Sequence, residues 1–190
     1  VDHGYKVAVC EQMEDASQAK GIVRREVIRV VTPGMVLEDE LLQPKANNFL
    51  MAFAPGEARF GVAFLDASTG DFLAAEVNTV QSLMDEVMRM DPREILVPES
   101  ARGQVPVKQL MKACPKALFT PLADAVFAGD RSRERLTNFG LSIPAGNEEA
   151  LRAVGGVLFY VQETQKAQPG HLSRLELYRV HDYMVLDETT

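Results

Sequence analysis

The sequence has no tryptophan, two cysteines and three histidines among its 190 residues. Cys10 and Cys114 lie far apart and form no CxxC motif, so the sequence predicts two buried, reduced thiols and no disulfide framework. The histidines form no HxH or HxxxH pattern, and we therefore expect no metal site. No apolar run approaches the roughly 18 residues that cross a bilayer. These absences predict a cytoplasmic protein without a membrane anchor.

Motifs that bind phosphate or activate a nucleophile are also missing. Neither GxxxxGK[ST] nor GxGxxG occurs, and these are the loops in which glycines let the backbone approach a phosphate. The sequence also lacks the GxSxG turn that presents a catalytic serine. We expect no catalytic residues, no cofactor-binding residues and no metal ligands in this chain.

Both ends of the sequence look internal to a longer chain. Val1 is not an initiator methionine, and the residues after it lack the zones of a signal peptide. Thr190 follows a strand-like run at 179–186 without a closing signal. Since domains usually run about 100 to 150 residues, we expect one complete domain with parts of two neighbours.

The net charge of −7 is unevenly distributed. Residues 1–34, called the front segment below, contain five basic and five acidic side chains, whereas residues 35–190 contain 22 acidic and 15 basic ones. An acidic body repels a phosphate backbone, because affinity for nucleic acid depends largely on Lys and Arg. If the chain contacts DNA, we expect the front segment to make the contact.

Alternating apolar residues predict two strands in the front segment, joined by a polar excursion and ending at the Thr-Pro-Gly turn of 32–34. Residues 35–46 are charged and contain Pro44, which is typical of a linker. Three apolar runs with short turns between them then predict an antiparallel meander: 49–53, 60–65 and 72–77. Both faces of 60–65 are apolar, so this strand should be central and covered on both sides.

Helical and strand patterns then alternate. Apolar spacing predicts a helix with Asn78 as its N-cap that ends at Asp91. Shorter patterns predict strands at 94–97 and 117–119 and helices at 107–113, 132–139 and 147–166. In the last helix Asn147 should be the N-cap. The adjacent Gly155 and Gly156 suggest that another element approaches this helix closely.

This order of elements is typical of an α/β fold with a ribonuclease-H-like mixed sheet. Three antiparallel strands come first, and βα units follow, whose parallel strands join the sheet beside its first strand through right-handed crossovers. We expect helices on both faces of the sheet and a partial N-terminal α+β segment before it. The sequence has no internal repeat or low-complexity segment that would indicate another architecture.

A metal-dependent nuclease of this fold is one alternative function, because two-metal phosphoryl chemistry uses carboxylates that converge on two cations. Asp66 ends the second meander strand, Asp71 begins the third and Glu94 opens the fourth. Asp66 also has a simpler interpretation as turn chemistry, since an Asp side chain readily accepts hydrogen bonds from backbone amides two residues on. We prefer the simpler interpretation, because the three acids show no metal-ligand spacing.

A DNA-binding module working through residues 20–29 is another alternative. Arg25 and Arg29 should share one face of a strand, and Lys20 lies in the turn that leads to it. Arginine on a strand can bind phosphate through two hydrogen bonds, although a solvated strand face with acids nearby would show the same pattern. The residues assigned to contact with the DNA backbone are Lys20, Arg24, Arg25 and Arg29.

Residues 7–34, VAVCEQMEDASQAKGIVRREVIRVVTPG, resemble the close of the mismatch-recognition domain of the MutS family, with its EQ, AKG, R-V and VTPG motifs in order. FGVAFLDASTGDF at 60–72 resembles the central hairpin of that family's connector domain, and DPREILVPES at 91–100 resembles its first crossover. Residues 158–165 and 183–187 are similar to the start of its core domain. The resemblance spans nearly the whole chain.

The resemblance implies four parts. The mismatch-recognition domain ends within 1–34, a linker covers 35–46, the connector domain covers 47–165, and 166–190 contains a second linker and the start of the core domain. The parent protein is then expected to be a homodimer, cytoplasmic and associated with the nucleoid, that binds mismatched duplex DNA and a MutL-type partner. ATP and Mg would bind an ATPase domain outside this chain. The chain itself would be a non-catalytic connector.

Overall fold

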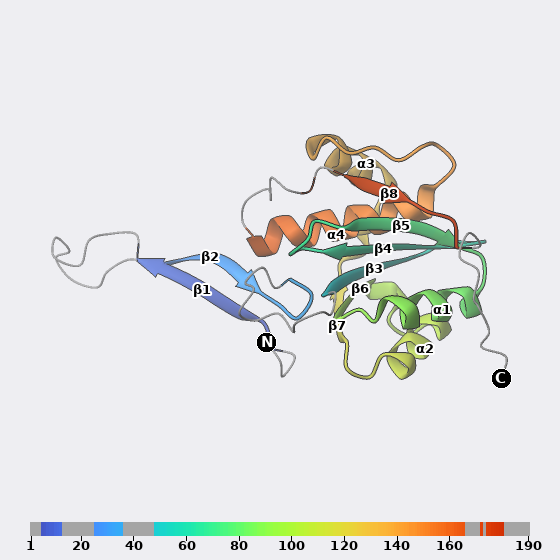
Figure 1. Cartoon of the computed structure of the whole chain (residues 1–190), viewed down its shortest axis with the longest axis horizontal. Coiled ribbons are helices and arrows are strands. Elements are labelled where there is room, and N and C mark those ends of the chain that lie inside the picture. Colours follow the sequence, from blue (N-terminus) through green and yellow to red (C-terminus); the bar gives the residue numbers. More distant parts are fainter. Residues whose placement is uncertain (1–4, 13–24, 36–47, 166–171, 173, 181–190) are drawn as a thin grey trace.

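A six-stranded mixed sheet forms the centre of the structure, and helices cover both of its faces (Figure 1). The computed structural model describes residues 5–12, 25–35, 48–165, 172 and 174–180. Its strands are β1 (Val7–Gln12), β2 (Arg25–Val31), β3 (Phe49–Pro55), β4 (Phe60–Asp66), β5 (Phe72–Val77), β6 (Glu94–Pro98), β7 (Leu118–Leu122) and β8 (Leu175–Leu177). Its helices are α1 (Val80–Met90), α2 (Val105–Ala113), α3 (Gly129–Asn138) and α4 (Glu148–Gln165), with 3-10 turns η2 (Glu99–Ala101) and η3 (Asp124–Phe127). The predicted α/β class is confirmed, and the predicted elements differ from the observed ones mostly by a few residues at their ends.

The large sheet has the strand order β7-β6-β3-β4-β5-β8. The antiparallel pairs β3–β4 and β4–β5 confirm the meander, and β6 and β7 join in parallel on the β3 side, as the sequence predicted. β8 pairs in parallel with β5 on the other side. The predicted strand at 179–186 is wrong in its described part: the edge of β5 accepts residues 175–177, and residues 179 and 180 are no longer extended strand. Residues 181–186 lie outside the described residues.

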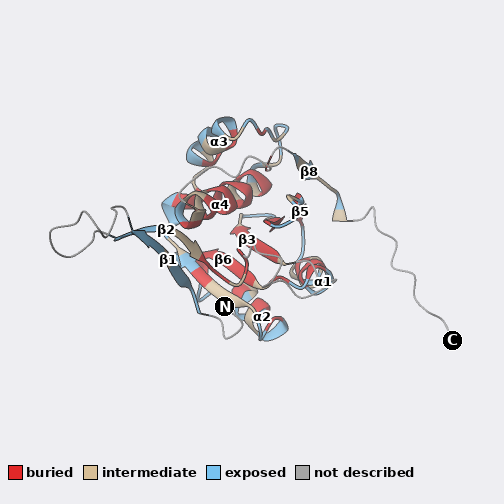
Figure 2. Ribbon diagram, turned by 60° about the vertical axis from the view of Figure 1, so that its left-hand side comes forward, coloured by how far each residue is buried: buried red, intermediate tan, exposed pale blue. Residues whose placement is uncertain are grey.

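Each face of the sheet has its own apolar core. Leu50 and Ala63 pack on the face covered by α3 and α4, whereas Met51 and Phe64 pack on the face covered by α1 and α2. Successive residues of a strand point to opposite faces, so β3 and β4 are buried on both sides. Figure 2 shows β3, β6 and much of α4 as buried. The prediction of a central, doubly covered strand at 60–65 is confirmed.

Three glycines set how closely α4 packs. A Cβ at Gly155 would overlap Ser132 of α3, and a Cβ at Gly156 would lie 2.7 Å from the ring of Phe127. These contacts confirm the close approach predicted for this pair. Gly61 of β4 has the same role toward the first turn of α4, because a Cβ there would overlap the backbone of Glu149. Backbone therefore lies against backbone where α4 begins.

Helix α1 starts at a different cap from the one predicted. Its N-cap is Thr79 and not Asn78, because Thr79 has the extended backbone of a cap and its hydroxyl accepts a 3.0 Å hydrogen bond from the amide of Ser82. The helix ends at Asp91, as predicted. The two candidate caps are adjacent polar residues, and the sequence alone does not show which of them leaves the helical conformation.

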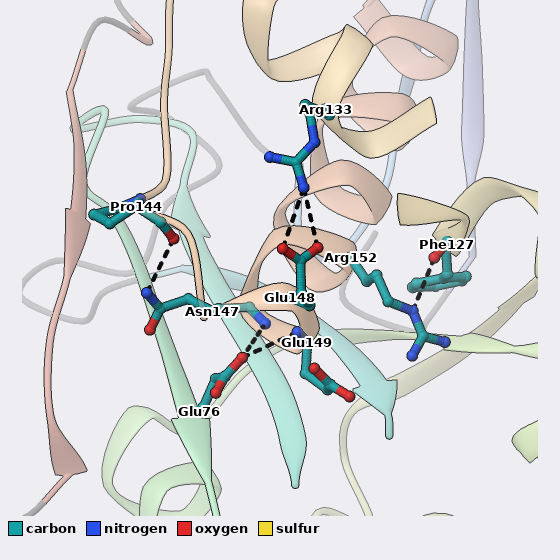
Figure 3. A network of polar contacts seen from close by, with 9 residues as sticks. Glu76, Phe127, Arg133, Pro144, Asn147, Glu148, Glu149 and Arg152 are labelled. Atoms are coloured by element: carbon teal, nitrogen blue, oxygen red, sulfur yellow. Dashed lines mark hydrogen bonds and ion pairs between the residues drawn. The ribbon is translucent and has the colours of Figure 1, made fainter. Parts of the chain in front are cut away.

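A carboxylate from the sheet accepts hydrogen bonds from the first amides of α4 (Figure 3). Oε1 of Glu76 on β5 accepts hydrogen bonds from the amide of Glu149, at 3.0 Å, and from the next amide, at 3.4 Å. The carbonyl of Asn147 accepts from Leu151, so Asn147 does occupy the N-cap position. Its side chain, however, donates to the carbonyl of Pro144 instead of capping the helix as predicted. A negative charge at the positive end of a helix is favourable, which explains why Glu76 takes this place.

Candidate functional site at the junction of hairpin and sheet

The β1–β2 hairpin is tied to the large sheet through the turn that follows β2. The amide of Met35 donates to the carbonyl of Thr32 at 2.9 Å and closes a Thr-Pro-Gly-Met turn. Met35 is 1% exposed and packs in the core on the α3–α4 face. A Cβ at Gly34 would lie 2.8 Å from the Cβ of Glu94, so a larger residue would displace the turn. The turn thus brings the front segment against the first residue of β6.

Glu94 is a fully buried carboxylate at this junction. Its Oε2 accepts from the hydroxyl of Thr32 at 2.5 Å and from the amide of Gly34 at 3.2 Å. Its Oε1 accepts from the hydroxyls of Thr120 at 2.6 Å and Tyr160 at 2.7 Å. A buried charge is strongly unfavourable unless donors surround it. One carboxylate oxygen therefore depends on the front segment, and the other binds β7 and α4.

Lys6 adds a positive charge from the front segment. Its Nζ lies 3.6 Å from Oε1 of Glu94 and 5.2 Å from the centroid of the Tyr160 ring. The Lys6 side chain is 38% exposed, so water and salt partly screen this ion pair. Burial, together with the nearby charge of Glu94, raises the pKa of the Tyr160 hydroxyl, which therefore remains a donor at neutral pH.

Asp66 binds Asn48, the residue that follows 36–47. Its Oδ1 accepts from the amide and the hydroxyl of Ser68, at 2.9 and 2.6 Å, which confirms the predicted turn chemistry. Its Oδ2 accepts from the amide of Asn48 at 2.9 Å. The side-chain amide of Asn48 donates in turn to the carbonyl of Pro33 at 3.0 Å. The residues that precede and follow 36–47 are therefore joined directly.

The carboxylates considered for a nuclease have structural roles here. Both oxygens of Asp66 and both oxygens of Glu94 accept hydrogen bonds, and Asp71 accepts from the hydroxyl of Thr69 at 2.9 Å. Within the described part of the chain, no three His, Cys, Asp or Glu side chains come together in a group that could hold a metal ion. The arrangement is suited to holding two parts of the chain in a fixed relation.

The predicted DNA-contact residues are only partly described. Outside the described residues lie Lys20 and Arg24. The β1–β2 pairing shifts at a bulge, so Arg29 lies opposite Val9 while Arg25 lies opposite Gln12. Val9 and Gln12 are three positions apart on β1 and point to opposite faces, and cross-strand partners share a face. The prediction that Arg25 and Arg29 share one face is therefore wrong, because the bulge inserts a residue that the alternation did not reveal.

The hairpin also exposes a cysteine that the sequence predicted to be buried. Cys10 is exposed, whereas Cys114, at the end of α2, is buried as predicted, and both are free thiols. Cys10 is exposed because β1 belongs to a two-stranded sheet whose residues are mostly open to solvent (Figure 2).

Sequence reasoning did not find the groups that surround Glu94. Lys6, Thr32, Thr120 and Tyr160 come from four distant parts of the chain, and no motif connects them. The available signal was weak: Thr120 places a hydroxyl within the short strand β7, and Tyr160 places one on the apolar side of α4. Buried polar atoms of this kind require partners, but the sequence does not say which.

A second buried carboxylate lies on the α1 face of the sheet. Glu86 is 4% exposed and accepts from the hydroxyl of Tyr178 at 2.7 Å and from Arg89 at 2.5 Å. The guanidinium of Arg89 also lies 5.6 Å from the centroid of the Tyr178 ring. Burial and the hydrogen bond to Glu86 raise the pKa of Tyr178, which keeps its hydroxyl a donor. These contacts fix the segment after β8 against α1.

The fold and the junction together define an α/β domain to which the end of a neighbouring unit is bound through buried polar contacts. Residues 48–173 match the family description "MutS domain II", and residues 1–40 match "MutS domain I". The chain belongs to the MutS family. None of the helices in the described residues is long and apolar enough to cross a membrane.

Several bacterial proteins named "DNA mismatch repair protein MutS" are similar to this chain along its whole length. The protein of Desulforapulum autotrophicum is 40% identical over 203 residues, covering 99% of this chain and 22% of its own length. The protein of Symbiobacterium thermophilum is 40% identical over 204 residues, covering 100% of this chain and 23% of its own length. That of Desulfosudis oleivorans is 36% identical over 199 residues, covering 100% and 22%. The chain thus spans under a quarter of the length of these relatives.

Proposed function

We propose that this chain is the connector portion of a DNA mismatch-recognition protein, with a ribonuclease-H-like sheet and no chemistry of its own. Its role is to transmit changes of orientation between two neighbours. One is the mismatch-binding unit, which ends in the front segment, and the other is the core domain, which begins within 166–190. Membership of the MutS family supports the setting. The single observation that carries the role is Glu94, which binds both units at once.

The Glu94 junction is suited to transmitting movement because its contacts with the front segment are nearly all made or all lost together. If the front segment moved away, the carboxylate would lose Thr32, Gly34 and Lys6 together and would keep only the two hydroxyls on β7 and α4. A buried charge left short of donors costs about 3 kcal/mol or more. A rotation of the front segment is therefore passed to the sheet and is not absorbed locally.

The rest of the proposal concerns the longer protein. We infer that it binds mismatched duplex DNA, works as a homodimer, binds ATP with Mg in a domain outside this chain, and communicates with a MutL-type partner. Its location would be cytoplasmic, on the nucleoid. The names of the relatives support the DNA substrate. The remaining features rest on the family resemblance of the sequence motifs.

Contacts to the DNA backbone are proposed for Lys20, Arg24 and one of the two arginines Arg25 and Arg29. Since Arg25 is exposed and lies on the face opposite to Arg29, one stretch of duplex should not engage both. In the longer protein, Arg25→Ala and Arg29→Ala should therefore differ: only one of them should make the salt dependence of duplex binding shallower by about one unit. Equal changes for both variants, or no change for either, would rule out this arrangement.

The coupling role is tested by Glu94→Gln in the longer protein. Glutamine keeps the shape but has only one accepting oxygen, so its NH2 group cannot accept the hydrogen bonds that now reach one of the two carboxylate oxygens. Mismatched duplex should still bind, while ATP-dependent release of the duplex should slow by about tenfold, in the range of ordinary coupling energies. The matched control is Glu57→Gln, an exposed acid outside the junction. Release by the Glu94 variant that equals release by the control would contradict the proposal.

A further inference from the structure

The segment around α2 is the longest stretch of the sequence without acidic residues. All 27 acidic side chains of the chain lie outside 100–123, although the net charge is −7. The same stretch contains four basic residues: Arg102, Lys108, Lys112 and Lys116. The region is therefore a positive island in an acidic molecule. Because salt screens charges beyond about 8 to 10 Å, an approaching group responds to this local charge more than to the net charge.

All four cations point to solvent. α2 buries Val107 and Leu110 against the sheet, while Lys108 and Lys112, one turn apart, lie on its outer side and are exposed. Arg102 and Lys116, which flank the helix, are also exposed. With respect to the described residues, none of the four cations forms an ion pair.

The same layer carries exposed apolar side chains. Among the described residues, five large hydrophobic side chains are exposed, and three of them belong to the front segment. The other two are Met88 of α1, 69% exposed, and Val105 of α2, 65% exposed. α1 and α2 lie together on one face of the sheet (Figure 1), whereas the α3–α4 face shows no such side chain in its described part. Methionine is enriched at protein interfaces.

We propose that the α1–α2 layer is a docking surface for an acidic protein segment that also carries apolar anchors. Lys108 and Lys112 would attract its carboxylates, and Met88 and Val105 would accept its apolar side chains. A nucleic acid fits less well, because its phosphates make no use of the exposed apolar side chains Met88 and Val105. The proposal concerns a partner and is independent of the Glu94 coupling role.

The probe is a fluorescein-labelled peptide of Glu, Asp and Leu residues, with polyglutamate and a duplex DNA as comparison ligands, titrated into the 190-residue chain. We expect saturable binding of the mixed peptide that weakens with salt. Lys108→Glu with Lys112→Glu should weaken it by about tenfold or more, because two attractions become repulsions. The control pair, Arg131→Glu with Arg174→Glu, makes the same change of charge at exposed sites outside the layer and should leave binding unchanged.

Val105→Ser tests the apolar part. It should weaken the binding of the mixed peptide and leave the salt dependence of that binding unchanged, since no charge changes. The Lys108→Glu, Lys112→Glu double variant should retain the wild-type unfolding midpoint, because within the described part of the chain neither lysine side chain forms a hydrogen bond or an ion pair. Equal affinity for polyglutamate and the mixed peptide, tighter binding of duplex DNA than of the peptide, or an equal loss in the control pair would each overturn the proposal.

Discussion

At the scale of single residues, Gly61 has the least room for a side chain among the described glycines. A side chain there would overlap the carbonyl of Glu149 and approach the amide of Ala150, and both are backbone atoms that cannot rotate away. Gly61→Ala should therefore lower the free energy of unfolding by about 3 kcal/mol, toward the upper end of overpacking effects. Urea denaturation measures it. Gly103→Ala is the control, since nothing lies within 4 Å of its Cβ, and equal losses in both variants would contradict the packing at β4 and α4.

The two thiols should react at very different rates. Cys10 is exposed, whereas Cys114 is 8% exposed, and burial together with the charge of Asp91 raises the pKa of its thiol. A raised pKa lowers the thiolate fraction at any given pH, and the thiolate is the reacting form. A thiol reagent at pH 8 should modify one cysteine quickly in the folded chain and the second only after denaturant is added. Cys10→Ser should abolish the fast phase, and a fast phase that survives in this variant would contradict the assignment.

At the scale of elements, the start of α1 is a direct test of which polar residue caps it. Thr79→Ala should lower the free energy of unfolding by about 1 kcal/mol, because the amide of Ser82 loses its acceptor. Asn78→Ala should change it by less than about 0.5 kcal/mol, as expected for a surface site without such a role. Urea midpoints of the two variants decide the matter. A larger loss at Asn78 would restore the cap that the sequence suggested.

Elements with strong periodicity were predictable, and contacts between elements were not. The meander, its central strand and the parallel additions follow from alternating apolar runs and short turns, and the Asp66 turn follows from local chemistry. The bulge that separates Arg25 from Arg29 leaves no mark in the sequence, because it depends on how two strands pair. β8 was missed since its three residues gain order only from the edge of β5.

The candidate site shows the same limit. The sequence shows Glu94 as an acid at the start of a strand, where it is one of three carboxylates of the nuclease alternative. Its actual surroundings combine the front segment, β7 and α4, which only the tertiary fold brings together. A buried carboxylate has the same residue type whether it binds a metal or hydroxyl groups, and the donors decide between the two.

At the scale of the whole molecule, stability should fall along the hairpin with distance from Glu94. The strands β3, β4 and β6 of the large sheet are buried, the turn after β2 is anchored at 31–35, and the outer parts of β1 and β2 are exposed. Amide exchange should be slow at 60–66, slow at 31–35 and fast at 25–28. Exchange followed by mass spectrometry measures this gradient. In Glu94→Gln, 31–35 should become fast while 60–66 stays slow, and protection that does not change in this variant would contradict the anchoring role of Glu94.

The bond between Asn48 and the carbonyl of Pro33 has a consequence for the covalent path of the chain. Segment 36–47 leaves and returns at one place, so its two attachment points are already held together by groups outside it. The length of such a segment matters little, since doubling it costs only about 0.6 kcal/mol of closure entropy. A single cut there would leave two pieces that still recognise each other through Glu94 and Asn48. The chain could therefore be opened at this point, or an entire foreign domain inserted, while the surfaces on either side keep their alignment.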